Sequence, residues 1–514
     1  MECWTLALSI LVGVLAVYYY LFRRGPNVFQ QHGIPCAMDF NFLRRLFEIF
    51  VFPKSFAKAL LDIYNVHPDA KYIGAFNLSR RVVVIRDLEL IKSIGIKSFE
   101  SFEDHLFFGT GDEDPLFSNN LLALRGDRWR DLRALLSPAF TSSKMKTMFH
   151  LMSECAVNFA EYLKTTAPPG GHVTEMKDAL TRYANDAIGT CAFGIGVDSM
   201  RHPENDFYMY GKKVTEFNTF ALIKILMIQN LPRLSRFLNI KMMDDRTTEY
   251  FVNLVTDTIR TRDERGITRP DMLQLMMDDR GKSSSRELTI MDMTSHVFIF
   301  FLAGFDSSST VMSFATYELG VNPDVQEKLQ NEIDEVLEDT NGQPSYEKIN
   351  GMTYLNAVIS EALRMYPPQP MTDRLCTKDF ELPATLPNAK PYLVKKGEMV
   401  WFPFYALHYN PEYFPEPDKF KPERFLDDNK DQCNLNAYYP FGLGPRMCIG
   451  NRFAQLEMKV LLFHLLARCD LKPCEKTPIP LKLKSGGFSM RAEGGCWLNI
   501  VPRRNQHSAI ASAK

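Results

Sequence analysis

A single cysteine near the C-terminal end lies in a loop that is suited to chemistry. Residues 439–452 read YPFGLGPRMCIGNR, and an apolar helical pattern follows over residues 453–466. The glycines and prolines before Cys448 disfavour a helix or a central strand, so we expect a loop that delivers Cys448 to a helix start. A thiol there, two residues from Arg446, is expected to favour the thiolate, which acts as a nucleophile or as a metal ligand. A lone cysteine without such a loop would more often be a buried structural residue.

An acid and a hydroxyl interrupt the longest apolar helical pattern. Residues 296–304 (HVFIFFLAG) are apolar all round, so the helix expected over residues 288–319 should cross the interior. Asp306 and Ser307 follow directly, and such groups are costly to bury unless they are used or solvated. Gly304 lacks a side chain and would let a flat ligand approach, while Ser307 can bond a carbonyl one turn earlier and bend the helix. The plainer alternative is packing serines beside a satisfied carboxylate.

Glu361 and Arg364 form a third pattern. Their spacing of i, i+3 places both side chains on one face of a predicted helix over residues 354–365. Taken alone, they would be an ordinary surface pair. Arg424, in the sequence Pro-Glu-Arg-Phe some sixty residues on, is a candidate third member.

The loop spacing Phe-Gly-x-Gly-x-Arg-x-Cys-x-Gly resembles the haem-binding loop of the cytochrome P-450 family. The resemblance extends from about residue 26 to residue 501, through five motifs in the family's order. It implies that Cys448 is the axial thiolate of haem b, the ligand type that favours O–O cleavage. It also implies that Phe441 and Gly442 belong to the cofactor cradle and that Gly304 lies beside the cofactor.

The same resemblance assigns roles to the other two patterns. Asp306 and Ser307 would relay protons to bound O2, although this chain has serine where the family usually has threonine. Ser308, Ser309 and Thr310 leave open which hydroxyl serves. Glu361, Arg364 and Arg424 would lock the core behind the cysteine loop, as a structural triad. Four side chains match the family's propionate-binding positions: Trp129, Arg133, Arg374 and Arg446.

The implied activity is that of a haem-thiolate monooxygenase of the microsomal type, close to vertebrate drug-oxidising and insect detoxifying enzymes. Its expected substrates are lipophilic compounds, with foreign toxins, insecticides or drugs favoured over an endogenous lipid, steroid or hormone. A reductase-independent isomerase or dehydratase and a haem carrier or sensor are the rival functions. By family position, the pocket would be lined by Phe107, Phe108, Phe117, Phe220, Phe300, Phe305 and Phe488.

Electrons must come from a partner, because no Gly-x-Gly-x-x-Gly opens a helix after a strand in this chain. An NADPH-dependent reductase is the implied donor, with a cytochrome b-type protein as a second source. A basic face that could dock it would comprise Arg128, Arg130, Lys144, Lys146, Arg452 and Lys459. Ordinary solvated charge explains the same residues equally well. The net charge of −1 gives no sign of a nucleic-acid partner.

The N-terminal stretch suggests a membrane anchor. Residues 3–22 (CWTLALSILVGVLAVYYYLF) carry no charge, and this length crosses a hydrocarbon core of about 30 Å. Arg23 and Arg24 follow, which places the body on the cytosolic side, at the endoplasmic reticulum membrane. A cleaved signal peptide is disfavoured by the missing basic start and cleavage site. Residues 230–241 (NLPRLSRFLNIK) read equally as a membrane-resting loop or as a packed loop.

Helical patterns dominate the rest of the chain. The composition, with 46% hydrophobic and 24% charged residues, is that of a globular protein, and ten scattered cysteines form no CxxC pair. We expect these cysteines to be reduced and mostly buried. The predicted fold class is mainly α with small β-sheets, after one transmembrane helix. The expected organisation is an anchor (1–24), a proline/glycine linker (25–36), one catalytic domain (37–503) and a flexible tail (504–514).

Overall fold

The computed structural model describes residues 12–13, 15, 28–37, 55–77, 80–106, 114–215, 224–225, 227–228, 232–278, 280, 288–485 and 490–503. The predicted anchor lies almost wholly outside these residues, and the tail after residue 503 lies outside them entirely. Residues 28–36, which we expected to form a linker, belong to the folded body. Phe29 of the short helix α2 (Val28–Gln31) is fully buried and packs on Phe76 and Tyr392.

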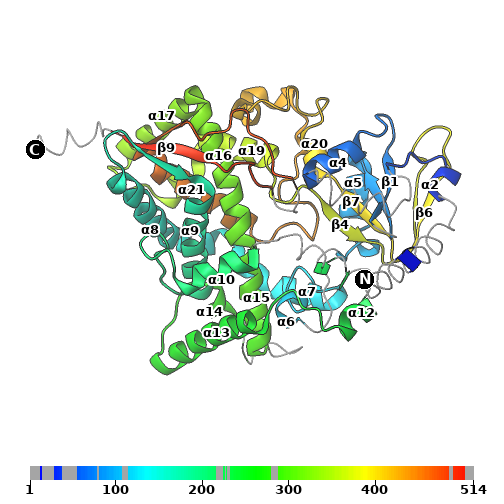
Figure 1. Cartoon of the computed structure of the whole chain (residues 1–514), viewed down its shortest axis with the longest axis horizontal. Helices are drawn as coiled ribbons and strands as arrows, with labels where there is room; N and C mark the ends of the chain where they lie inside the picture. Colours follow the sequence, from blue (N-terminus) through cyan, green and yellow to red (C-terminus); the bar gives the residue numbers. More distant parts are fainter. Residues whose placement is uncertain are drawn as a thin grey trace, which may run out of the picture.

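Helices make up most of the described chain, as predicted (Figure 1). In the first half they are α4 (Phe56–Tyr64), α5 (Leu88–Lys92), α6 (Pro115–Ser118), α7 (Gly126–Leu136), α8 (Ser142–Thr166), α9 (Met176–Ile188), α10 (Asp206–Thr215), α12 (Pro232–Phe237) and α13 (Asp245–Arg265). In the second half they are α14 (Met272–Asp278), α15 (Ile290–Ala303), α16 (Ser309–Val321), α17 (Pro323–Asp339), α18 (Tyr346–Gly351), α19 (Thr353–Met365), α20 (Phe404–His408) and α21 (Asn451–Leu466).

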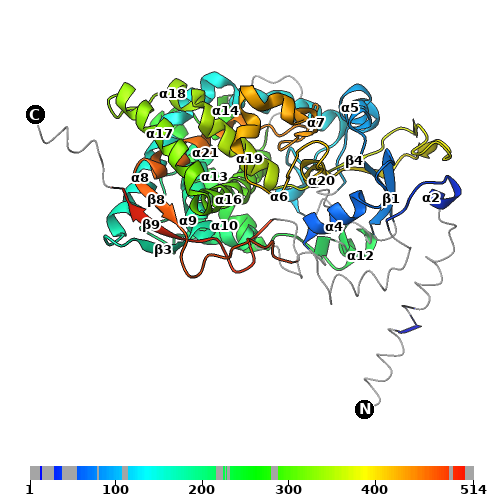
Figure 2. The same ribbon diagram turned by 90° about the horizontal axis from the view of Figure 1, so that it is seen from above.

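The apolar pattern over residues 288–319 forms the central helix of the body. Thr289 and Asp292 start it with a reciprocal capping box. α15 and α16 are joined by a single wider turn, Gly304–Ser308. Within the described residues, Ile290–Val321 is long and apolar enough to span a bilayer, but 67% of its most apolar window is buried. It is therefore the core helix that the pattern predicted, and α8, α9 and α21 lie around it (Figures 1 and 2).

Three small sheets complete the fold. β1 (Tyr72–Asn77), β2 (Arg80–Ile85), β7 (Met399–Phe402) and β4 (Thr372–Leu375) form one sheet in the order β1-β2-β7-β4. β3 (His172–Glu175), β9 (Trp497–Pro502) and β8 (Cys469–Lys472) form the second, and β5 (Phe380–Leu382) pairs with β6 (Tyr392–Val394). β1 and β2 form an antiparallel hairpin, paired from Tyr72–Ile85 to Asn77–Arg80. The first sheet lies at the end of the molecule away from α8 and α17 (Figure 1).

Candidate functional site

The predicted site residues converge on one cavity of about 480 Å³. Its walls come from the central helix, the loop before α21, the start of α7 and strand β4. Predicted residues that line it are Phe117, Trp129, Arg133, Phe300, Gly304, Asp306, Ser307, Arg374, Phe441, Gly442, Arg446 and Cys448. Most of the other lining side chains are apolar, so the cavity suits an apolar ligand with a few polar anchor points.

The cysteine loop is held by its own backbone. The amide of Cys448 donates to the carbonyl of Phe441 at 2.9 Å, and α21 begins three residues later with Gly450 as its N-cap. Gly444 has a φ of +69°, and a Cβ there would lie 2.1 Å from the carbonyl oxygen of Gly95. Only glycine fits that approach, so the loop is seated against the neighbouring helical turn with Cys448 turned towards the cavity.

The surroundings of Cys448 shift the pKa of its thiol in opposite directions. The side chain is open to the cavity but enclosed by its walls, and this burial raises the pKa of the thiol above its ordinary value. The backbone amide of Gly450 and the charge of Arg133 lower the pKa only in part. The helix start alone does not secure a thiolate, whereas a coordinated metal removes the thiol proton outright. The donor therefore fits a metal better than a free nucleophile.

The wider turn in the central helix has the local cause that the sequence predicted. The hydroxyl of Ser307 donates to the carbonyl of Ala303, one turn earlier, at 2.5 Å. Gly304 has a packing role besides the predicted one, because a Cβ there would meet Ile188 of α9 at 3.2 Å. The missing side chain thus serves the packing of α9 against the central helix, although Gly304 also lines the cavity.

Asp306 lines the cavity and is ion-paired, a feature that its sequence context did not reveal. Lys177 of α9 places Nζ 2.9 Å from Oδ1 of Asp306 and 2.6 Å from the hydroxyl of Ser309. Arg491 lies 4.0 Å from the same carboxylate oxygen. Burial lowers the pKa of Lys177, although the charge of Asp306 opposes the shift. The acid is therefore held on one side by cations while it faces the cavity.

A buried acid on α21 lies near the wider turn of the central helix, and no sequence pattern singled it out. Glu457 of α21 is completely buried. Burial raises its pKa to about 8, and the hydroxyl of Ser308 lowers it only in part. Ser308 itself lines the cavity. The sequence signal for Glu457 was a charged residue inside the apolar run 453–466. Its protonation, however, depends on its burial in the folded structure.

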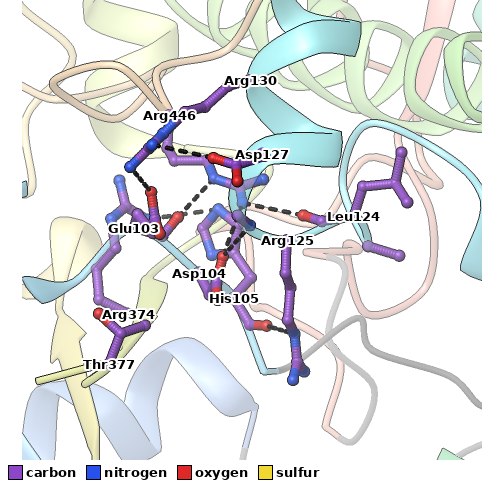
Figure 3. A network of polar contacts seen from close by, with 12 residues as sticks. Glu103, Asp104, His105, Leu124, Arg125, Asp127, Arg130, Arg374, Thr377 and Arg446 are labelled. Atoms are coloured by element: carbon purple, nitrogen blue, oxygen red, sulfur yellow. Dashed lines mark hydrogen bonds and ion pairs between the residues drawn. The ribbon is translucent and has the colours of Figure 1, made fainter. Parts of the chain in front are cut away.

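The four predicted propionate residues all line the cavity, and Figure 3 shows two of them, Arg374 and Arg446, in one group of polar residues. The guanidinium of Arg446 lies 3.9 Å from the ring centre of Trp129. Arg446 is already bonded to the carbonyls of Glu103 at 2.7 Å and Leu124 at 2.9 Å. Burial lowers its pKa to about 9.

Arg374 is the better candidate for an added anion. It is 1% exposed, and its Nε is a buried donor without a partner. Burial lowers its pKa to about 10. Arg133 contributes a second cation and donates to the carbonyl of Met447 at 2.9 Å. A buried N–H donor that lacks a hydrogen-bond partner within the described residues, among guanidinium groups, suits an added carboxylate. A haem propionate would supply such a carboxylate.

His105 joins this cluster, although its sequence context gave no warning. It lines the cavity, and Nδ1 lies 3.0 Å from Oδ1 of Asp373. Nε2 faces Arg374 at 3.5 Å. Burial lowers the pKa of His105, while the hydrogen bond to Asp373 opposes the shift. Figure 3 shows His105 beside Asp104, in the group of polar residues that includes Arg374 and Arg446.

Glu361, Arg364 and Arg424 meet as the resemblance predicted. Arg364 donates to the two carboxylate oxygens of Glu361 at 2.8 and 2.9 Å, and Nε of Arg424 lies 3.2 Å from Oε1. Glu361 and Arg364 are completely buried, and Arg424 is 7% exposed. Arg364 also donates to the carbonyl of His408, so the triad ties α19 to the segment that precedes the cysteine loop.

Two other predictions are corrected by the structure. Phe305 does not line the cavity, because its ring turns away to pack on Phe301 and Tyr208. Lys459 cannot belong to a docking face, since it is 5% exposed and bonds Asn350 at 2.8 Å. The other predicted pocket residues, Phe107, Phe108, Phe220 and Phe488, lie outside the described residues.

Comparisons with known proteins agree with this geometry. The family model described as Cytochrome P450 matches residues 70–498. Cytochrome P450 9e2 of Blattella germanica is 42% identical, with 98% of each chain covered. Probable cytochrome P450 9f2 of Drosophila melanogaster is 37% identical over 96% of this chain and 98% of its own. Cytochrome P450 6k1 of Blattella germanica is 34% identical, again with 98% of each chain covered.

Proposed function

The chain belongs to the cytochrome P450 family, and from that premise we propose that it oxidises lipophilic foreign compounds at a microsomal membrane. As a member it is a haem-thiolate monooxygenase, an oxidoreductase that uses O2 and electrons from a partner reductase. The single observation that supports the site assignment is that Cys448, Asp306 and Arg374 all line one apolar cavity.

Haem, when bound, would supply the iron at which O2 is activated, and a cysteine thiolate would coordinate that iron. We assign Cys448 as that ligand, because the loop turns its sulfur into the cavity. Arg374 would bind one propionate through its unpartnered Nε, with Arg133, Trp129 and Arg446 around it. The buried triad behind the loop would keep this cradle in shape and take no part in turnover.

The chain's own contribution to oxygen chemistry is proton movement. Asp306 would take up protons on the side held by Lys177 and pass them into the cavity through a hydroxyl. Ser307 and Ser308 both line the cavity, so each is a candidate for the last transfer. Substitution by alanine, one at a time, separates them by the peroxide released for each NADPH consumed. If Ser307→Ala leaves product and peroxide unchanged, Ser307 is not the relay.

The substrate class follows from the cavity wall. Phe117, Ile188, Ile299 and Phe300 present aromatic and aliphatic surface, and such walls select weakly polar molecules. Purified protein would be titrated with foreign lipophiles and with natural lipids, and the shift in haem spin state would be recorded. Binding of steroids or fatty acids alone would favour the endogenous role over the detoxifying one.

Membrane association is the second part of the proposal. The apolar stretch over residues 3–22 would anchor the chain in the endoplasmic reticulum, with the body on the cytosolic side. α12 adds a contact surface, since Phe237 is 85% exposed and Leu234 is 43% exposed beside the basic Arg236. An amphipathic patch of this kind suits the boundary between head groups and acyl chains.

Reductase docking would use the basic residues that remain at the surface: Arg128, Arg130, Lys144, Lys146 and Arg452. Arg130 is paired with Glu103 and Lys146 with Glu347, which weakens the field they offer a partner. Double charge reversal at Arg128 and Lys144 should slow reduction at low salt and leave carbon monoxide binding unchanged. Unchanged reduction would remove this face from the proposal.

The cheapest test of the whole assignment is spectroscopic. The reduced carbon monoxide complex of a thiolate-ligated haem has a characteristic red-shifted Soret band, and its loss in Cys448→Ser would locate the ligand. NADPH consumption with added reductase then separates an oxygenase from a reductase-independent isomerase and from a carrier. The rival functions need no proton relay, which the Asp306 arrangement supplies.

A further inference from the structure

Asp114 departs from the usual behaviour of an aspartate before a helix. It immediately precedes α6, with Pro115 in the first helical position, where an aspartate side chain commonly caps its own helix. Here the side chain makes no capping bond to α6. It is 4% exposed, so its carboxylate has been turned inward towards another element.

That element is the segment leading into α13. Oδ2 of Asp114 accepts hydrogen bonds from the backbone amides of Met242 and Met243, both at 3.0 Å. Two amide donors on one carboxylate oxygen make a charge-assisted link, stronger than bonds between neutral groups. The link joins positions about 130 residues apart in the chain, so no local structure requires it.

The linked elements both form the cavity wall. Phe117 of α6 and Met242 line the cavity. α6 is fixed to the central helix on its other side, where Ser295 donates to the carbonyl of Pro115 at 3.0 Å. The rings of Phe117 and Phe298 pack edge to face, with centres 5.7 Å apart. The hydrogen bonds of Asp114 therefore join α6, which is fixed to α15, to the segment that leads into α13.

We propose that Asp114 is a positioning residue that sets the width of the cavity between α6 and the segment leading into α13, and so the size of substrate admitted. The inference deepens the proposed function and rests on the cavity being the substrate site. It does not depend on which lipophile is the natural substrate.

The burial and hydrogen bonding of the Asp114 carboxylate support a positioning role. Among the described residues Oδ1 is buried and has no hydrogen-bond partner, a costly arrangement that an apolar side chain would avoid if packing were the only requirement. Burial raises the pKa of Asp114, while the amides of Met243, Met242 and, within α6, Phe117, together with the charge of Lys241, lower it. The amides thus favour the charged form that makes the strongest tie.

The test uses the haem-loaded full chain and ligands that coordinate iron through nitrogen. Imidazole is the small probe, and an N-alkylimidazole with a dodecyl chain is the large one. In Asp114→Ala, association and dissociation of the large probe should accelerate about tenfold, while imidazole rates stay the same. Asp114→Asn keeps one acceptor oxygen and should fall between. Asp245→Ala, an 87% exposed carboxylate at the start of α13, is the control and should match the wild type.

Equal rates for the large probe in wild type and Asp114→Ala would overturn the proposal. So would an equal acceleration of both probes, since general loosening has no size dependence. If the alanine variant fails to take up haem, Asp114→Asn decides, with amide hydrogen exchange at Met242 and Met243 as second readout. In this variant the amide exchange rates of Met242 and Met243 must rise together with the association and dissociation rates of the large probe. Failure of the proposed function shows separately, as a wild type without the thiolate carbon monoxide band.

Discussion

Replacing Glu361 by glutamine should prevent the chain from holding haem. The carboxylate accepts four hydrogen bonds: two from Arg364, one from Arg424 at 3.2 Å and one from the amide of Lys421 at 2.9 Å. Glutamine keeps the shape but removes the charge. Two buried guanidinium groups would then lack their counter-charge beside the segment that carries the cysteine loop.

The magnitude follows from burial. Removing one partner of a buried ion pair costs about 3–5 kcal/mol, because the remaining charge stays desolvated. That is a large share of the roughly 5–15 kcal/mol that stabilises a typical domain. Burial lowers the pKa of Arg364, but Glu361 raises it more, so the pKa is raised overall. A cation whose pKa is higher in the folded than in the unfolded chain contributes its full stabilisation at every pH below its unfolded pKa. The destabilisation by Glu361→Gln should therefore be the same at every pH from mildly acid to mildly alkaline.

The assay compares haem content per mole of protein and the urea unfolding midpoint of Glu361→Gln with those of the wild type. The control is Asp257→Asn, which breaks a surface i, i+3 pair with Arg260 whose side chains are 61% and 65% exposed. Such a pair is worth at most about 1 kcal/mol, so the control should load haem normally. A Glu361→Gln protein that is folded, fully loaded and as stable as the control would refute the triad argument.

Three further outcomes follow from the packing. Glu457 has a folded pKa of about 8, above the unfolded value of about 4.3, so wild-type stability should fall as pH rises between those values. In Glu457→Gln this decrease of the urea unfolding midpoint with pH should disappear. An unchanged decrease would mean that another group titrates in this pH range. Gly211→Val puts a Cβ 2.6 Å from the rings of Phe301 and Phe305 and should cost about 1–3 kcal/mol in thermal unfolding, unless the rings shift freely. Arg374→Leu should release haem to an apo-globin acceptor faster than the wild type, because a buried propionate partner is lost; equal release would argue that Arg374 faces no anion.

Much of the site could be predicted because its signals are local. The loop over residues 441–450 carries its cysteine, arginine and glycines at fixed spacing, and a tight loop leaves few ways to arrange them. The pair Glu361 and Arg364 follows from helical periodicity. The apolar run before Asp306 was enough to place the central helix in the core.

What the sequence could not decide depends on contacts between distant segments. Lys177 meets Asp306 across 129 residues, and Asp114 reaches Met243 across the same span. Glu457 and Lys459 look like surface charges on an amphipathic helix, yet both are buried, because α21 is packed on several sides. Local spacing determines what chemistry a loop or a helical turn can hold. Only the folded core determines how far each charge is removed from water, and hence its pKa and its partner.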